Sequence, residues 1–448
     1  MKTLLFTIFI VSCMFTANAQ HIDLSLQKCK EMAVENNENI KIARYQNEQA
    51  RVEKQSAFTA YLPKFAGSAT YAYMYGNMEM DLPEIDLIVP IMGMEMDMSY
   101  MIPQNVDLKI NTDVYMIGVN VQQPIFAGGK IIAGNQMAKK GIEITDENMN
   151  LTRMNVIADA EKAYWNYFLI QDKIELLKQY ESLLDTLYYS ISDMVSVQMA
   201  TDAELLKISS RKSNIQYQIQ KATNGLELSR MQLCRIIGID LNTNITLSDT
   251  LAKHEHITTQ TSHDINLRPE YKILQKQLEL KDLNVKMVRG DYLPTFGIMA
   301  GYSYMGKIHI DDMSIKMNEP MPIIMASLSI PIFHFGEGAK KIQSAKIAKN
   351  IQQEECNKNE KLLQIEMQYV TRSLEEALLL ITTADIALEQ AETNLKQSQD
   401  NYDVGMGTLL DVLDAQTQWQ EAYSNSIEAK IDYKIKEIEY LKAMGTLE

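Results

Sequence analysis

QPIFAGGK, at residues 123–130, occurs a second time in the chain as IPIFHFGE, at residues 330–337. The two prolines, Pro124 and Pro331, are 207 residues apart, and the stretches that follow them keep this spacing without a net insertion or deletion. A similarity that holds its register in this way indicates an internal duplication. The chain of 448 residues is therefore predicted to consist of two related units rather than several unrelated globular domains.

The duplication extends in both directions from these two stretches. Downstream, Gly238 of RIIGI corresponds to Gly445 of KAMGT, again 207 residues apart. Upstream, Pro63 of AYLPKF corresponds to Pro294 of DYLPTF at a spacing of 231 residues, so the first unit has 24 extra residues between its YLP and PIF patterns. Each unit is thus predicted to contain a helix, a variable segment, a long helix, a break and a return helix.

The ends of the two units define the predicted domains. The chain opens with a basic residue, an apolar run and an Ala-Asn-Ala triplet, which is the layout of a cleavable secretory signal over residues 1–19. The alternative is a lipoprotein processing box in which Cys13 is acylated as a membrane anchor. A first repeat at residues 20–238, a linker at residues 239–264 and a second repeat at residues 265–448 follow.

Long stretches of both repeats have helical periodicity. In the second repeat, large and small residues alternate at heptad spacing, which is typical of a helix that approaches a partner helix closely. The residues of this seam are Leu374, Ala377, Ile381, Ala384, Leu388, Ala391, Leu395 and Ser398. Neither Pro nor Gly interrupts residues 339–404, so a rod of about 100 Å is predicted at 1.5 Å per residue. With breaks at residues 198–201 and 405–408, the fold class is mainly α with β, and four long coiled-coil helical segments are expected per chain.

Between the YLP and PIF patterns the period of the apolar residues changes to two, which is typical of β-strands. The predicted strands are residues 64–76, 112–126, 295–306 and 321–333. Strands of about ten residues are long enough to cross a membrane. Four strands are too few to close a barrel, and an open sheet edge is not tolerated in lipid. The chain is therefore expected to oligomerise, with eight strands from two copies or twelve, nearer to an open bore, from three.

Prolines and glycines are expected to form the turns between helices and strands. The predicted structural turns are Pro63, Pro294, Pro124, Pro331, Gly129 and Gly336. The first two prolines are expected to end the incoming helices, because proline cannot continue the helical hydrogen-bond ladder. The two glycines are expected to let the chain turn from a strand into a rod.

In their order and spacing, the signal peptide, the duplicated helix–YLP–strands–PIF–helix unit and the stretch YDVGMGTLLDVLDAQTQW at residues 402–419 resemble the TolC family of outer-membrane efflux factors. The resemblance covers essentially the whole mature chain. It implies a homotrimeric TolC-like tube in the cell outer membrane and its lipid, with a shared 12-stranded transmembrane β-barrel, a long periplasmic α-helical extension, and an equatorial band built from the linker and the chain termini.

The resemblance also implies partners and a function. The periplasmic tip of such a tube docks a periplasmic adaptor (a membrane fusion protein) and an inner-membrane transporter of the RND or ABC type. The protein is accordingly expected to be the exit duct of a tripartite efflux or type I secretion system, with no cofactor. The alternatives are a soluble periplasmic coiled-coil scaffold, or a version of the duct that exports copper or silver.

Asp411 and Asp414 lie three residues apart, just after the second break. One interpretation is that they are solvated acids at a helix N-terminus, where the helix dipole favours negative charge. In a trimer, however, each acid would occur three times around the tube, and stacked rings of acids in a narrow pore select or weakly bind cations. The resemblance favours the second interpretation, because this stretch carries such rings in the family.

The resemblance assigns further tip residues one position at a time. Tyr402 matches the tip tyrosine of the family, and Gly405 matches the glycine of the same pattern. Glu204 stands where the family has an aspartate that pairs with this tyrosine. Gly407 replaces an arginine of well-known members, and Gln198 replaces the usual glycine of the first repeat, so the closure of this tip is expected to differ.

A methionine-rich segment, PIMGMEMDMSYM at residues 90–101, is not explained by the family pattern. Its alternating residues Met92, Met94, Met96 and Met98 would lie on one face of an extended strand. Thioethers are soft ligands that suit Cu(I) or Ag(I), so these residues are candidate metal ligands. The alternative is an outward hairpin whose flexible apolar side chains fill one face.

Composition argues against other functions. The formal charge is −15, from 43 basic and 58 acidic residues, and no basic patch stands out, so nucleic acid is a poor candidate partner. Cys29, Cys234 and Cys356 are widely separated and are predicted to be buried free thiols rather than disulfides or metal ligands. No phosphate-binding loop, GxSxG or HExxH motif occurs. The chain is therefore predicted not to be an enzyme.

Overall fold

The computed structural model describes residues 21–83, 85–91, 93–103, 105–249, 264–305, 308–310, 313–315 and 320–447. The predicted signal peptide, Cys13, Met92 and most of the predicted linker lie outside these ranges. The chain divides into two compact units. The first, here called the helical unit, consists of Met1–Ala50, Gly141–Leu278 and Gln352–Glu448; the second, the strand unit, consists of Arg51–Lys140 and Glu279–Ile351. Both sequence repeats contribute to both units.

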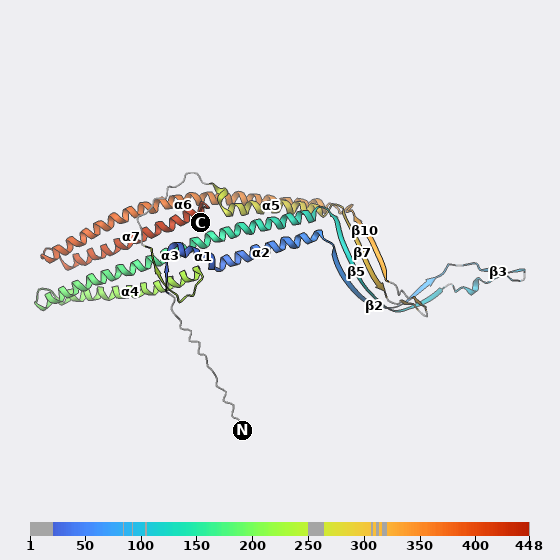
Figure 1. Cartoon of the computed structure of the whole chain (residues 1–448), viewed down its shortest axis with the longest axis horizontal. Helices are drawn as coiled ribbons and strands as arrows, with labels where there is room; N and C mark the ends of the chain where they lie inside the picture. Colours follow the sequence, from blue (N-terminus) through green and yellow to red (C-terminus); the bar gives the residue numbers. More distant parts are fainter. Residues whose placement is uncertain are drawn as a thin grey trace, which may run out of the picture. The chain divides into compact units, whose positions relative to one another are not determined.

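Two helices of 67 residues each, α3 (Lys130–Ser196) and α6 (Glu337–Asp403), are the longest elements. Each is followed by a return helix, α4 (Asp202–Ile237) after α3 and α7 (Leu409–Ala443) after α6. Figure 1 shows α4 running back beside α3, and α7 beside α6. The breaks between them, at 197–201 and 404–408, contain the predicted breaks and begin one residue earlier.

Ion pairs and the heptad seam hold these helix hairpins together in the helical unit. Lys212 Nζ lies 2.6 Å from Asp185 Oδ1 between α4 and α3, and Lys430 Nζ lies 2.9 Å from Asp385 Oδ1 between α7 and α6. The large members of the α6 seam are buried or half-buried, and its alanines are buried. Small residues at alternate positions let the helix backbones approach, as the sequence pattern predicts.

Shorter elements complete the helical unit. They are β1 (His21–Leu24), α1 (Leu26–Asn36), β6 (Asn244–Leu247), the 3₁₀ turn η3 (Ile265–Leu267), the first part of α2 (Glu38–Phe58) and the first part of α5 (Pro269–Gly290). Strands β1 and β6 pair in parallel, although more than 200 residues separate them in sequence. The Asp249 carboxylate links this corner, because Oδ2 accepts from the Leu26 amide at 2.7 Å and from the Tyr164 hydroxyl at 2.9 Å.

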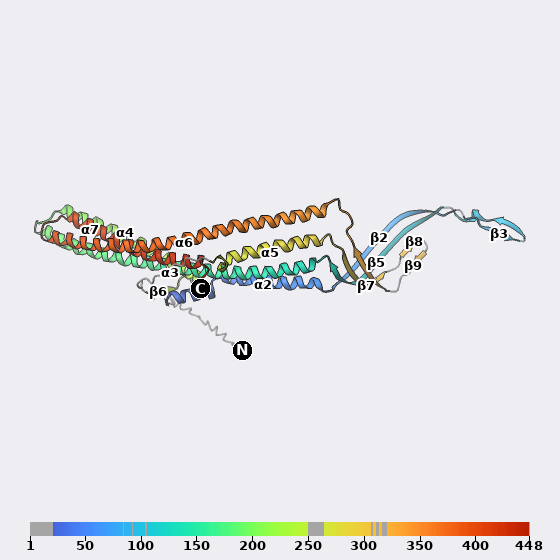
Figure 2. The ribbon, with the colours of Figure 1, turned by 90° about the horizontal axis from the view of Figure 1, so that it is seen from above.

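The strand unit is built on an antiparallel sheet. Its long strands are β2 (Lys64–Asp81), β5 (Asn105–Ala127), β7 (Thr295–Met305) and β10 (Met321–Ser329), in the spatial order β10–β7–β5–β2. Figure 2 shows β2 and β5 side by side as one ribbon. Many apolar side chains of these strands are exposed in the single chain, Phe65, Tyr71, Tyr75 and Ile324 among them.

The two repeats pair their strands in the same register. Lys64 of β2 lies opposite Gln122 of β5, and Thr295 of β7 lies opposite Ser329 of β10. These four residues correspond to one another at the sequence spacings of 231 and 207 residues. The duplication found in the sequence is therefore also a duplication of hydrogen-bonded structure.

The strand boundaries differ from those expected at three points. Strand β2 continues to Asp81 rather than ending at residue 76, and β5 already begins at Asn105 rather than at residue 112, because the two strands stay paired along a longer ribbon. Strand β10 ends at Ser329 rather than at residue 333. Pro331, which has no N–H to donate, follows this end.

Four short strands of the strand unit were not predicted. They are β3 (Ile88–Ile91), β4 (Met94–Asp97), β8 (Ile308–Ile310) and β9 (Met313–Ile315). Strands of three or four residues carry too few alternating positions to reveal a period of two. A 3₁₀ turn, η2 (Ser99–Met101), follows β4.

The predicted turn residues lie at the junctions between elements, with one difference. Helices α2 and α5 end at Phe58 and Gly290, several residues before the prolines expected to end them, and a 3₁₀ turn, η1 (Thr59–Tyr61), follows α2. Pro63 and Pro294 instead directly precede strands β2 and β7. Leu62, before Pro63, has extended backbone, as proline favours for the residue that precedes it.

The PIF patterns lead into the long helices through glycines with left-handed backbone. Pro124 lies within β5, where the register against β7 shifts between Pro124 and Phe126, as is usual for a strand proline at a bulge. Gly129 and Gly336 have φ of +80° and +83° and lie directly before α3 and α6. This conformation costs an L-amino acid with a side chain about 1–2 kcal/mol.

The described residues also bear on membrane-spanning helices and on the predicted free thiols. In these ranges of the chain no helix has the length and apolar character needed to cross a membrane. Cys29, Cys234 and Cys356 are free and buried, as predicted, and their Sγ atoms lie near the carbonyl oxygens of Ala160, Thr243 and Leu274.

Candidate functional site

The candidate site is the pair of helix breaks at the ends of α3 and α6, here called the tip. In the second repeat the amide of Gly405 donates to Tyr402 O at 3.0 Å and the amide of Met406 donates to Asn401 O at 2.8 Å. These two bonds form a Schellman motif, which satisfies the last carbonyl groups of a helix. The first repeat makes the same bonds, from Gln198 to Val195 O at 3.0 Å and from Met199 to Met194 O at 2.8 Å.

A left-handed residue is required at the centre of each motif. Gly405 has φ of +74°, and open space surrounds the position of a Cβ atom there. At the corresponding position of the first repeat, Gln198 has φ of +63°. The first repeat therefore holds the same turn with a residue that bears the cost of a Cβ atom in this conformation.

The return helices begin with matching capping boxes. The Thr408 amide donates to Asp411 Oδ2 at 2.8 Å, and the Asp411 amide donates to Thr408 Oγ1 at 3.2 Å. At the start of α4 the Thr201 amide donates to Glu204 Oε2 at 2.9 Å. Hydrogen bonds from Thr408 hold the pKa of the Asp411 carboxyl below its usual value. Asp411 and Glu204 are thus both helix caps in the single chain.

Asp411 and Asp414 lie on the exposed face of α7. Leu409, Val412 and Leu413 are buried on the opposite face, so the helix presents its two acids away from the helical core. Residues three apart on a helix share one face. The arrangement gives two carboxylates that are about one helical turn apart and accessible to ions in the single chain.

Tyr402 does not make the carboxylate contact that the resemblance implies. Its hydroxyl lies 3.9 Å from Met194 Sδ, while the Glu204 carboxylate accepts from Thr201. Burial raises the pKa of the Tyr402 hydroxyl, and the negative charge of nearby Glu204 adds to this effect. The Glu204 side chain folds back onto its own helix start, as Asp411 does in the second repeat.

Apolar residues are exposed around the tip. Val197, Met199, Val404 and Met406, two from each Schellman motif, are all exposed in the single chain. Gly407 lies between them and the capping box, and a Cβ atom there would approach the Tyr402 amide nitrogen to 3.3 Å. Exposed apolar patches that are rimmed by polar residues commonly mark sites of protein contact.

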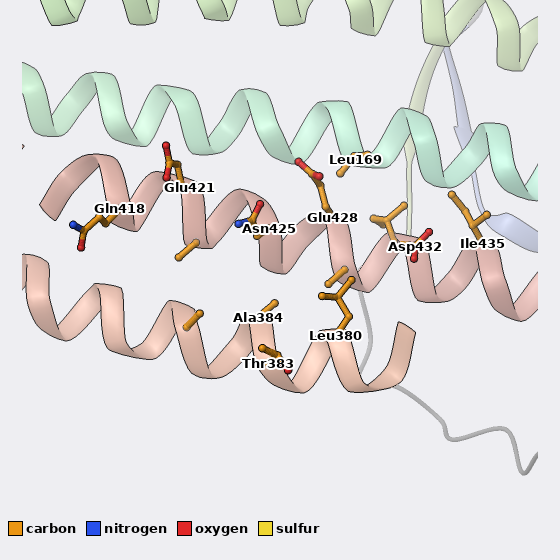
Figure 3. A pocket seen from close by; sticks show the side chains of 14 residues that line it. Leu169, Leu380, Thr383, Ala384, Gln418, Glu421, Asn425, Glu428, Asp432 and Ile435 are labelled. Carbon is orange, nitrogen blue, oxygen red and sulfur yellow. The ribbon is translucent and has the colours of Figure 1, made fainter. Parts of the chain in front are cut away.

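Sequence reasoning missed a groove in the helical unit between α3, α6 and α7. The groove encloses about 700 Å³, and Figure 3 shows its lining side chains. The α6 wall is mainly apolar, with Leu380 and Ala384, and the α7 wall carries both apolar and acidic or amide side chains. The polar α7 residues of the lining are Gln418, Glu421, Asn425, Glu428 and Asp432. Their spacing of three or four residues was a readable signal for one polar helix face.

The predicted methionine residues lie in the strand unit, away from the tip in sequence. Met94 and Met96 are on β4 and Met98 follows it, while Met92 lies outside the described residues. Within the described ranges, no three or more His, Cys, Asp or Glu side chains are grouped so as to hold a metal ion.

A duplicated chain whose long helix hairpins end in matched tips, and whose paired strands expose apolar side chains, has the construction of a TolC-like channel. The family model for "Outer membrane efflux protein" matches residues 30–238 and 265–446. The chain belongs to this family of transport channels. Its place is the outer membrane, with its helical part in the periplasm.

Known relatives agree with this assignment. The outer membrane protein TolC of Vibrio cholerae is 20% identical over 343 residues, which are 75% of this chain and 78% of that protein. Among solved structures, the CmeC outer membrane channel of Campylobacter jejuni superposes with a TM-score of 0.76 and 20% identity, over 94% of this chain and 86% of that one. The open state of the Neisseria gonorrhoeae MtrE outer membrane channel has a TM-score of 0.74 and 16% identity, over 94% and 89% of the two chains. These structures share the fold.

Proposed function

We propose that the protein is the exit duct of a tripartite efflux or type I secretion system, assembled as a homotrimer with a shared 12-stranded barrel. The observation that carries the proposal is the four long strands β10–β7–β5–β2, in which β2 and β10 each have one partner among the described strands. Unpaired backbone groups in lipid cost several kcal/mol each, so both edges require partner strands. Three copies would supply them and leave a bore.

The exposed apolar residues of the tip support a periplasmic adaptor as the docking partner. Val197, Met199, Val404 and Met406 surround turns that are built alike in the two repeats, so a trimer would present six similar contact points. An adaptor that binds there would connect the duct to an inner-membrane pump of the RND or ABC type.

The two exposed acids of α7 support a charged constriction at the tip. In the trimer, Asp411 and Asp414 would form two stacked rings of negative charge in the duct, which would select cations or bind them weakly. Asp411 also caps its helix, whereas Asp414 has no part in the capping box. Asp414 therefore reports on the ring without a change to the cap.

Single-channel recording of the reconstituted protein tests the proposal. We expect Asp414→Asn, and more strongly the double variant with Asp411→Asn, to reduce block by multivalent cations and to change conductance. Glu389→Gln with Glu392→Gln, a pair of exposed acids with the same spacing on α6, is the matched control. Channels that form normally but respond to cations identically in all variants would refute the ring, and the absence of any conducting trimer would refute the duct.

A further inference from the structure

Methionine is concentrated in one segment whose role the channel function does not explain. Eight of the 28 methionines in the chain lie within residues 74–101. The described part of this segment includes a small hairpin, in which β4 pairs antiparallel with β3 and Gly93, with φ of +85°, lies in the turn. The hairpin therefore places Met94 and Met96 on a paired strand.

Two thioethers share one face of this hairpin. Met94 and Met96 are two residues apart on β4, so their side chains point to the same side. Their cross-strand partners are Ile91 and Val89, which keep carboxylates off this face. Glu95 and Asp97 lie on the other face, opposite Pro90 and Ile88.

The next two thioethers lie at the corner that follows β4. The Met101 amide donates to Met98 O at 2.9 Å, which closes a single 3₁₀ turn. Residues three apart in such a turn are eclipsed, so Met98 and Met101 lie on one side of it. The corner is fixed to the start of the hairpin, because the Met98 amide donates to Leu87 O at 2.8 Å and the Leu87 amide donates to Ser99 Oγ at 2.8 Å.

These methionines are not core residues. The exposed fractions of Met94, Met96 and Met101 are 74%, 52% and 61%, so they fill no interior space in the chain. The carboxylate of Asp97, which lies between Met96 and Met98 in sequence, accepts from the Ser99 amide at 2.9 Å and is turned toward its own backbone. Accessible sulfur atoms without competing carboxylates suit a soft, monovalent metal ion.

We propose that Met94, Met96, Met98 and Met101 form a binding site for Cu(I) or Ag(I). The site goes beyond the proposed duct and does not depend on its partners or on its tip. Sulfur ligands of this kind suit soft ions and do not suit the hard cations Mg²⁺ and Ca²⁺, which take oxygen ligands.

Silver(I) is the probe, because it is soft and does not change oxidation state in air. The full chain in detergent micelles is titrated with silver nitrate in chloride-free buffer and followed by calorimetry, and we expect about one ion per chain. The variant with Met94, Met96, Met98 and Met101 all changed to Leu should weaken binding by at least about tenfold, since even second-shell changes cost that much. The control changes Met321 and Met325 to Leu, which are exposed to 54% and 46% on β10.

A second measurement uses the unaltered chain and so does not depend on how a variant folds. Silver bound to a thioether blocks its oxidation, so limited peroxide treatment followed by peptide mass spectrometry should show Met94 and Met96 protected by silver, and Met321 unprotected. Equal binding by the four-leucine variant, an equal loss in the control variant, or equal oxidation of Met94 and Met96 with and without silver would each overturn the site. Channel activity enters neither measurement, so failure of the proposed duct would be recognised separately.

Discussion

At the scale of single residues, the two helix breaks of the tip, here called the first and the second tip after their repeats, differ in backbone strain. The same Schellman motif is centred on Gly405 in one repeat and on Gln198 in the other, with φ of +74° and +63°. Sequence alone identifies Gln198 as a departure from the family pattern, but it does not say whether the turn is kept. The structure shows that the turn is kept, so the first tip is the more strained of the two.

Gln198→Gly should therefore stabilise the first tip by about 1 kcal/mol, because it removes the cost of a left-handed Cβ. Hydrogen exchange at the Met199 and Ala200 amides, which donate to Met194 O, should slow about fivefold, since 1.4 kcal/mol corresponds to a factor of ten. The matched change Gly405→Ala should accelerate exchange at Met406 and Gly407. Unaltered exchange at both tips would show that backbone strain does not control their opening.

Burial also determines the reactivity of the cysteines. Burial raises the pKa of the Cys29 thiol to about 12, and the Glu161 carboxylate nearby adds to the increase. Because the thiolate is the reactive form, iodoacetamide at pH 8 should leave Cys29, Cys234 and Cys356 unlabelled in the folded protein and label all three in urea. Mass spectrometry of the alkylated chain is the measurement, and labelling of Cys29 in the native state would contradict the buried position.

The buried Cys29 thiol also makes stability depend on pH. Since folding raises the pKa of this thiol, the contribution of Cys29 to stability is complete below about pH 9, the usual value for the thiol, and is lost as the pH rises toward 12.

At the scale of elements, the sequence predicted the helices better than the strands. The α6 seam follows from a seven-residue repeat within the helix itself, and Leu374, Ala377 and Ile381 are buried as that repeat requires. The parallel pairing of β1 with β6 is set by a contact between segments far apart in sequence, and no local period reports such a contact. The extension of β2 to Asp81 likewise depends on its partner β5 rather than on its own residues.

The seam predicts a clear stability contrast on α6. Ile381→Ala should reduce the free energy of unfolding by about 2–5 kcal/mol, because it leaves a cavity between packed helices. Glu376→Ala, on the exposed side of the same helix, should change it by less than about 0.5 kcal/mol. Denaturant unfolding followed by circular dichroism measures both, and equal effects would mean that the seam does not carry the packing.

At the scale of the whole molecule, the duplicated strand register has a consequence for assembly. Within one chain the repeats meet where β5 pairs with β7, with Asn120 opposite Gly301 and Val121 opposite Ala300. If the proposed trimer closes its barrel by repeating this junction, the free edge of β10 meets the free edge of β2 in the next chain. Residues 207 positions after those of β5 lie on β10, and residues 231 positions before those of β7 lie on β2. The corresponding pairs between two chains are therefore Ser327 with Thr70 and Leu328 with Ala69.

Cysteine pairs test this register directly. Residues that face each other on antiparallel strands have Cα atoms about 4.5–5.5 Å apart, which is within the range of a disulfide. Thr70→Cys with Ser327→Cys, and Ala69→Cys with Leu328→Cys, sample adjacent pairs of which one has the closer geometry. At least one should give linked dimers and trimers on non-reducing gels. Thr70→Cys with Ile323→Cys, displaced by about 13 Å along the strand, should not cross-link, because strands rise about 3.3 Å per residue. Efficient linking by the displaced pair alone would show that the chains meet in another register, and monomers throughout would show that the two edges do not meet, which would leave the four strands of each chain without a closed wall.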